Sequence, residues 1–258
     1  MKILALSNGH CKDEIDKALA MADFDKLLIF GNYVDPIKDE VDVVEDLRSL
    51  FQLRYKKPNL VKLLIGPEDV QYLFPWDRTF RTPSYRTDIA DRITTIFNVN
   101  NDALDVAFQQ DNFIFTYGGI NNGWVFAFKD IIKKTASIGE QLIQSEVALD
   151  DVLNSMFLDN AMQMSLLKKD RSLEISTNVN NPYIYPGPIF GTYHSMQQIG
   201  VLANYHQVVA CKPEGKHRYS KRNFQEGRFF PDRSVTFCSD ELNMTVNSRL
   251  IDTDSEKK

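Results

Sequence analysis

The sequence predicts an α/β fold, and two features of its first half point to it. Short apolar runs at Lys2–Leu6, Leu27–Phe30 and Leu60–Ile65 alternate with stretches in which apolar residues recur at helical spacing. Each run ends at a cluster that contains glycine. Alternating strands and helices predict a largely parallel sheet with helices on its faces. The loops after such strands gather at one edge of the sheet, where ligands usually bind.

The predicted helices follow the runs in order. Asp13–Ala22 comes after the first run, and Val41–Leu53 comes after the second, with apolar residues in register along one face. Ile89, Ile93 and Ile96 mark a third helix. A fourth strand is predicted at Phe113–Thr116, ending at Gly118-Gly119. The length allows one large domain as readily as two small ones, and we expect a single domain over residues 1–258.

The second half of the chain does not continue the regular alternation of strands and helices. Residues 125–170 are predicted to be helical without strands, as an insertion, and Asn178–Gly187 is predicted to be a loop because it is rich in Asn, Pro, Gly and Tyr. Residues 252–258 are charged and are expected to form a flexible tail. Short β-type runs are predicted at Pro188–Phe190, Val208–Ala210, Val235–Cys238 and Met244–Val246.

Composition narrows the class of protein. The net charge of −5 argues against a large nucleic-acid footprint, and we interpret the locally basic stretch Lys212–Arg228 as a solvated loop. An odd number of cysteines, three, excludes a full disulfide framework. Met1–Leu6 is too short for a secretory leader, and no segment is long and apolar enough to span a bilayer. We therefore expect a cytoplasmic protein without a membrane anchor.

Glycine-containing clusters follow the strand-like runs at regular points along the chain. In order they are Asn8-Gly9-His10, Gly31-Asn32-Tyr33-Val34-Asp35-Pro36, Gly66-Pro67-Glu68-Asp69, Thr116-Tyr117-Gly118-Gly119 and Gly191-Thr192-Tyr193-His194. Together they resemble the motifs of the calcineurin-like metallophosphoesterases, in particular the serine/threonine protein phosphatase branch. The resemblance covers Met1 to about His194. It implies a sandwich of two central β-sheets flanked by helices.

The resemblance also shows which family residues are replaced. The family has Asp-x-His where this chain has Asn8 and His10, and its second motif has a metal-bridging Asp at the position of Asn32. Its phosphate-binding Arg corresponds to Pro36, and its catalytic His corresponds to Glu68. Three further metal ligands, an Asn and two His, correspond to Pro67, Tyr117 and Thr192.

These replacements bear on metal binding. Divalent cations in such sites bind carboxylate oxygens and imidazoles, and the two-metal mechanism relies on both metals to activate a bridging water. One of the two metal positions implied by the resemblance loses all of its ligands. The other keeps His10 and His194, which could hold a single zinc or manganese ion weakly. We expect no tightly bound metal or other cofactor.

Four of the predicted site positions are interpreted as residues that stabilise loops, and Glu68 is interpreted as a candidate for proton transfer. Asn8 and Asn32 can hold their loops by bonding to nearby backbone. Asp35 and Asp69 are not metal ligands in the family, so we interpret them as residues that maintain loop geometry. Glu68 is the candidate for an acid or base, with a plain surface carboxylate as the alternative.

The function predicted is that of a pseudophosphatase, which keeps the scaffold and binds a protein partner or a phosphorylated ligand without turnover. One alternative is an active phosphoesterase with a non-standard metal centre around His10, His194, Glu68 and Asp35. A second alternative is a structural or assembly subunit that uses its acidic surface or the helical insertion.

Overall fold

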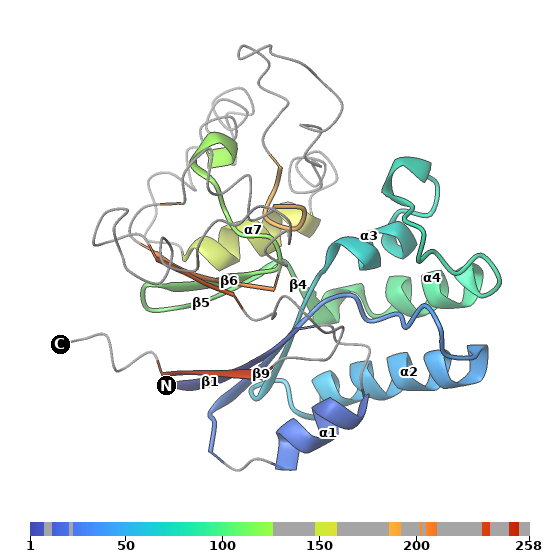
Figure 1. Ribbon diagram of the computed structural model, residues 1–258, viewed down its shortest axis with the longest axis horizontal. Coiled ribbons are helices and arrows are strands. Elements are labelled where there is room, and N and C mark those ends of the chain that lie inside the picture. The colour runs from blue at the N-terminus through green and yellow to red at the C-terminus, as the bar shows by residue number, and fades with distance from the viewer. Residues whose placement is uncertain are drawn as a thin grey trace, which may run out of the picture. The chain divides into compact units, whose positions relative to one another are not determined.

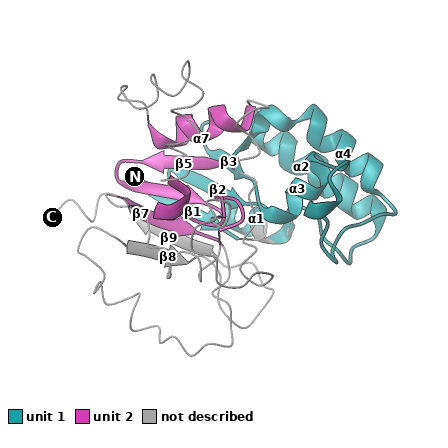
Figure 2. Cartoon of the chain, turned by 90° about the horizontal axis from the view of Figure 1, so that it is seen from above, with its two compact units in different colours: residues 1–105, 238–258 teal, residues 106–237 magenta. Residues whose placement is uncertain are grey.

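The fold is α/β and contains two β-sheets. The computed structural model describes residues 1–7, 12–20, 23–125, 148–158, 186–191, 202, 205–210, 234–237 and 248–252. The chain divides into two compact units: unit 1 comprises residues 1–105 and 238–258, and unit 2 comprises residues 106–237 (Figure 2). None of the described helices is long and apolar enough to cross a membrane.

The sheet of unit 1 has five strands in the order β4-β3-β2-β1-β9. β1 to β4 run parallel to one another, and β9 pairs antiparallel with β1, so that Lys2 lies opposite Asp252. The strands are β1 (Lys2–Leu6), β2 (Lys26–Phe30), β3 (Val61–Leu64), β4 (Leu104–Asp105) and β9 (Ser248–Asp252). Because β1 to β4 are parallel, their carboxyl ends meet at one edge of the sheet, which we call the strand edge.

The described part of unit 1 contains the α-helices α1 (Lys12–Ala20), α2 (Glu40–Lys56), α3 (Pro67–Leu73) and α4 (Ala90–Val99), and the short 3-10 helices η1 (Arg78–Phe80) and η2 (Asn101–Ala103). α2 begins after Asp39, whose side chain accepts a hydrogen bond from the Asp42 N–H and caps the helix. α2 packs against β3 and α4, and α3 packs against α4 (Figure 1). The residues of β1, β2 and β3 are nearly all buried, as expected for parallel strands that are covered on both faces.

Unit 2 contains a four-stranded sheet in the order β5-β6-β7-β8. β5 pairs antiparallel with β6, while β6, β7 and β8 are parallel. The strands are β5 (Ala107–Gln110), β6 (Phe113–Thr116), β7 (His206–Val209) and β8 (Ser234–Phe237). Helix α7 (Leu149–Leu158) packs against β5, where the Asn154 side chain accepts from the Ala107 N–H at 3.1 Å and donates to the Ala107 carbonyl at 3.1 Å.

Several elements differ from the sequence-based predictions. Phe113–Thr116 is a strand, but it follows the hairpin partner β5 and lies in the second sheet, not in the parallel series of the first. Pro188–Phe190 is a turn and not a strand, closed by the Phe190 N–H on the Gly187 carbonyl at 3.1 Å. The short elements α3, β4 and β5 were not predicted, because they span too few residues to show a clear period.

Other predictions fall partly or wholly outside the described residues. α7 lies within the range 125–170 that is predicted to be a helical insertion, but most of that range is not described. The basic stretch Lys212–Arg228 and the run Met244–Val246 are not described either. β9 ends at Asp252, and residues 253–258 of the expected tail are outside the description.

Candidate functional site: the strand edge of unit 1

The strand edge carries most of the predicted site positions that the structure describes. Asn32 and Asp35 follow β2, and Pro67, Glu68 and Asp69 form the first turn of α3 after β3. Tyr117 follows β6 in unit 2. The other predicted positions, which are Asn8, His10, Thr192 and His194, lie outside the described residues.

The loops after β2 and β3 touch through their backbones at Gly31. A Cβ atom on Gly31 would lie 1.9 Å from the Gly66 nitrogen and 2.3 Å from the Gly66 Cα. Residue 31 must therefore be glycine because there is no space for a Cβ atom, and not because of its backbone dihedral angles. The Gly31 N–H also donates to the Leu64 carbonyl at 2.7 Å, which extends the pairing of β2 and β3 into the loop.

Asp69 binds both loops through its carboxylate. Oδ2 accepts hydrogen bonds from the N–H groups of Asn32 and Gly66, each at 2.8 Å, and Oδ1 accepts from the Tyr33 N–H at 2.8 Å. We call this arrangement the Asp69 clamp. It also satisfies the N–H of Gly66, the residue that precedes the first turn of α3.

The Asp69 side chain is fully buried, and this affects its charge. Burial raises the pKa of Asp69 to about 7, although the three N–H donors oppose the shift and the nearby Glu68 adds to it. The carboxylate therefore changes charge near neutral pH. Because both oxygens already accept backbone hydrogen bonds, Asp69 acts as a structural acid that holds two loops.

Asn32 has a backbone conformation and a side-chain bond that suit an amide. Its φ of 61° lies in the left-handed region, which asparagine tolerates better than most residues. Its Oδ1 accepts a hydrogen bond from the Glu68 N–H at 3.1 Å, so the side chain ties the loop after β2 to the start of α3. Asn32 thus carries no anionic oxygen to offer a cation, and its amide oxygen is already bonded.

Tyr33 fixes the loop after β2 through its buried side chain, and this role was not predicted from the sequence. Its ring is buried, and its Oη lies 2.8 Å from the Ile29 carbonyl and 2.7 Å from the Leu64 carbonyl. Burial raises the pKa of Tyr33 well above its usual value, with Asp69 contributing in the same direction. The one signal in the sequence was an aromatic residue directly after a Gly-Asn pair.

Asp35 shapes the rest of the loop after β2. Its Oδ1 accepts from the N–H groups of Ile37 at 2.8 Å and Lys38 at 3.2 Å, a turn stabilised by an aspartate side chain. Arg86 donates to the Lys38 carbonyl at 2.6 Å and pairs with Asp88 through two nitrogens, at 3.0 and 2.7 Å. Arg86 was not predicted, because it contacts this loop from a distant part of the sequence.

Pro67 and Glu68 begin α3 and differ in what they can offer a ligand. Pro67 occupies the first helical position, where its missing N–H costs nothing, and it has no ligand atom in its side chain. Glu68 is partly exposed. Among the described site positions predicted from the sequence, Glu68 is therefore the carboxylate that solvent can reach and that is not committed to the backbone; Asp105, at the end of β4, is partly exposed as well but pairs with Lys62.

The described residues at the ends of β2 and β3 do not fit a two-metal centre. Asn32 is a bonded amide, Pro67 has no donor atom, and Asp69 is buried with both oxygens in use. Within the described ranges no three His, Cys, Asp or Glu side chains are grouped so that they could hold a metal ion. A divalent cation would need several free oxygen or imidazole ligands at this edge.

A second close approach of two loops occurs within unit 2, next to Tyr117. A Cβ on Gly118 would lie 2.4 Å from the Gly191 nitrogen, and one on Gly191 would lie 2.3 Å from the Gly118 oxygen. The Tyr117 carbonyl accepts from the Ala210 N–H at 3.0 Å. The fourth and fifth glycine clusters predicted from the sequence, at Gly118 and Gly191, thus meet in space within unit 2.

The loop after β6 is held by uncharged side chains. Thr116 Oγ1 accepts from the Gly119 N–H at 3.0 Å. The buried Gln207 amide accepts from the Ile120 N–H at 2.7 Å and donates to the Ile120 carbonyl at 2.8 Å. Gly119 adopts a φ of 83°, which glycine accommodates without strain.

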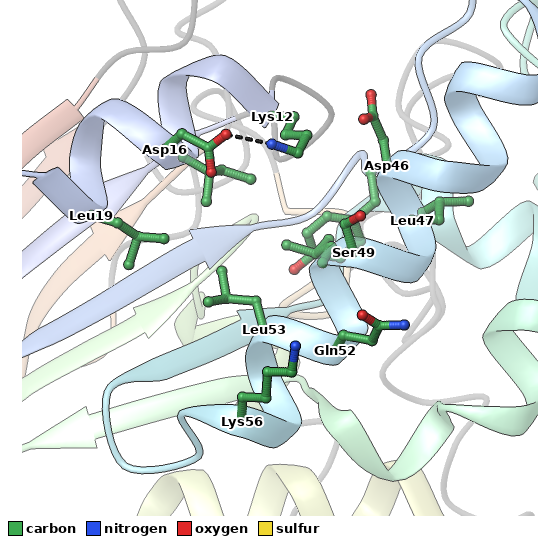
Figure 3. Close-up of a pocket in the computed structure, with 12 residues that line it drawn as sticks. Lys12, Asp16, Leu19, Asp46, Leu47, Ser49, Gln52, Leu53 and Lys56 are labelled. Atoms are coloured by element: carbon green, nitrogen blue, oxygen red, sulfur yellow. Dashed lines mark hydrogen bonds and ion pairs between the residues drawn. The ribbon is translucent and has the colours of Figure 1, made fainter.

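A pocket of about 300 Å³ lies between α1 and α2 (Figure 3). Apolar side chains from both helices form much of its lining, and the ion pair between Lys12 and Asp16 lies at its rim. Tyr33, which supports the loop after β2, also lines it. None of the predicted site positions that the structure describes is among its lining residues.

Comparisons with known proteins do not assign a family. No protein-family profile and no curated protein sequence matches the chain. One solved structure to which the chain is similar is a cold-active protein-tyrosine phosphatase of a psychrophile, Shewanella sp., at 16% sequence identity and a TM-score of 0.39. The match covers 82% of this chain and 65% of that one. A likeness at this TM-score supports no statement about fold or activity.

Proposed function

We propose that the protein is a catalytically impaired metallophosphoesterase-like protein, a pseudophosphatase, that acts by binding a protein partner or a phosphorylated ligand at the strand edge. The observation that carries the proposal is the Asp69 clamp together with Asn32. The loops after β2 and β3 are in close contact, and the oxygens of Asp69 and Asn32 accept hydrogen bonds from backbone N–H groups and are not free to bind metal.

The fold supports the proposal at the level of architecture. The parallel strands β1 to β4 bring their loops to one edge, and a second sheet is present. An α/β chain with two β-sheets supports the resemblance to calcineurin-like metallophosphoesterases only at this coarse level, and fold alone does not assign activity.

Metal content and turnover test the proposal directly. We expect purified protein to hold well below one equivalent of zinc or manganese by mass spectrometry, and to leave p-nitrophenyl phosphate intact in the presence of manganese. Stoichiometric metal, with turnover that His10→Ala abolishes, would overturn the proposal in favour of an active enzyme with a non-standard centre. In that case Glu68→Gln would show whether the exposed carboxylate takes part.

Restoring carboxylates provides a positive control for the scaffold. Asn32→Asp can still accept the Glu68 N–H, so the loop should keep its conformation. We expect the double variant Asn8→Asp/Asn32→Asp to bind manganese more tightly than the original chain in a calorimetric titration, because it returns two anionic ligands. Asp42 is an exposed residue of α2. The variant Asp42→Asn exchanges a carboxylate and an amide away from the strand edge, and it serves as the control for a general effect of such an exchange on manganese binding.

A further inference from the structure

The loop that joins α3 to α4, residues 74–89, is held in place by its own side chains; we call it the aromatic loop. Phe74 and Phe80 are buried, with ring centres 6.0 Å apart, and the Tyr85 ring stacks on Tyr72 at 5.2 Å. The Thr82 N–H donates to Gln71 Oε1 at 3.0 Å. These contacts fix an irregular segment on unit 1 that would otherwise lose much conformational entropy for little burial.

This ordered loop presents a large aromatic ring and two cations to solvent. Trp76 is 74% exposed, with one edge of its ring against Phe74. Arg78 is exposed, and the Arg81 guanidinium lies over the Tyr85 ring, 4.6 Å from its centre. Tryptophan, tyrosine and arginine are the residues most enriched at the energetic centres of protein interfaces.

The two acidic side chains of the same loop are already engaged. Asp77 accepts from the Thr79 N–H at 2.9 Å and from its hydroxyl at 2.7 Å, and Asp88 pairs with Arg86. Asp77 keeps its negative charge when it accepts these bonds, and the aromatic loop is nevertheless positive overall, because three arginines (Arg78, Arg81, Arg86) outnumber its two aspartates in a chain whose net charge is −5.

A surface with exposed acidic side chains lies at the start of α2. Ile37 is 90% exposed and Val41 is 61% exposed, and beside them Asp42 and Glu45 are exposed on the first turns of the helix. Spacings of three and four residues place Val41, Asp42 and Glu45 on neighbouring parts of the helix surface. We call Ile37, Val41, Asp42 and Glu45 the acidic surface.

The aromatic loop and the acidic surface are neighbours within unit 1. Arg86 of the aromatic loop donates to the Lys38 carbonyl at 2.6 Å, directly after Ile37, and Arg92 of α4 pairs with Glu40 of α2 (Figure 1). Two adjacent surfaces of complementary charge, each with exposed apolar side chains, meet the requirement for a two-fold interface in which each surface contacts the other on the second copy.

We propose that a second copy of this chain binds here, with the aromatic loop of each protomer against the acidic surface of the other. Trp76 then covers the exposed Ile37 and Val41 side chains, and Arg78 and Arg81 face Asp42 and Glu45. The inference does not rest on the proposed function, because association of two copies requires neither metal nor ligand at the strand edge, although Ile37 belongs to the loop after β2 that Asp35 shapes.

A charge-exchange experiment tests the proposal by sedimentation velocity on the full chain. We expect a concentration-dependent dimer, and we expect Arg78→Glu/Arg81→Glu and Asp42→Lys/Glu45→Lys each to raise its dissociation constant about tenfold or more. Mixing the two reversed variants should restore association as a heterodimer, since every contact then again joins opposite charges. Trp76→Ala should weaken the dimer of the original chain by a similar factor.

Folding and general charge effects are controlled separately. All the substituted residues are exposed, and circular dichroism of each variant checks that the fold is intact. Lys56→Glu/Lys57→Glu makes the same change of charge at the opposite end of α2 and should leave association unchanged. A monomer at all accessible concentrations, a dimer indifferent to both reversals, or reversed variants that fail to associate when mixed would each overturn the proposal.

Discussion

Two pairs of loops in this protein touch backbone to backbone at glycines, and different chemistry holds each pair. In unit 1 the loops after β2 and β3 meet at Gly31 and are joined by the buried Asp69 carboxylate. In unit 2 the segments around Gly118 and Gly191 meet, and the loop after β6 is held by the uncharged Thr116 and Gln207 side chains.

The difference has an energetic consequence. A carboxylate can accept several backbone N–H groups at once and bonds them more strongly than a neutral oxygen does. The same group is costly to bury as an anion, whereas a hydroxyl or an amide does not change charge. We therefore expect the unit 1 contact to be the stronger of the two and the one that depends on pH.

Gly31→Ala should have the largest effect. Its Cβ would collide with the Gly66 backbone and with Asp69 Oδ2, neither of which can move without breaking the Asp69 clamp. We expect the free energy of unfolding to fall by about 4 kcal/mol or more, measured by urea denaturation. Gly191→Ala in unit 2 should cost less, because its Cβ would overlap the facing backbone less closely than at Gly31 and would displace no buried carboxylate; equal costs would remove the distinction between the two contacts.

Asp69→Ala should have the second largest effect on the free energy of unfolding. It leaves the N–H groups of Asn32, Tyr33 and Gly66 without their acceptor, and buried unpaired groups cost about 1–3 kcal/mol each. With some access of water we expect a loss of about 3 kcal/mol in the same assay. Asp69→Asn, which keeps one acceptor oxygen, is the matched control and should lose less.

The pH dependence of stability should separate the original chain from Asp69→Asn. The folded pKa of Asp69, about 7, lies above its unfolded value of 3.8. The protonated form therefore supports the fold at low pH, and this contribution is lost as pH rises toward 7. Between pH 5 and 7 the stability of the original chain relative to Asp69→Asn should fall by about 2 kcal/mol. Parallel curves for the two proteins would contradict the raised pKa.

Thr116→Val should have the smallest effect. It removes the acceptor for the Gly119 N–H and keeps the shape of the side chain, so we expect a loss of about 1 kcal/mol. The loss should be the same at pH 5 and pH 7, since no charge is involved. A loss that changes with pH would mean that a titrating group also contributes to the unit 2 contact.

Local sequence patterns predicted the longer strands and helices of the first half of the chain. The runs that became β1, β2 and β3 are apolar throughout, and the register of Val43, Val44, Leu47 and Leu50 predicted α2. The short elements α3, β4 and β5 escaped prediction because they span too few residues to show a clear period. Phe113–Thr116 was predicted to be a strand, but period alone does not select a partner strand and so did not place it in the second sheet.

Site prediction was limited in a similar way. The sequence named Asn32, Asp35, Glu68 and Asp69 as positions at strand ends, because glycine clusters mark where strands stop. It did not reveal Tyr33 or Arg86 as supports, since their partners are backbone carbonyls brought close by folding. The predicted positions Asn8, His10, Thr192 and His194 remain predictions.

By itself, the sequence determined an α/β chain with alternating strands and helices in its first half, and with Asn32, Pro67, Glu68 and Asp69 directly after two of its strands. Those properties follow from the hydrophobic period and from the chemistry of single side chains. Only the tertiary structure decided that Asp69 is buried among three N–H groups and that Asn32 is bonded to the start of α3. Burial and the choice of hydrogen-bond partner depend on residues far apart in the chain, so no local pattern can specify them.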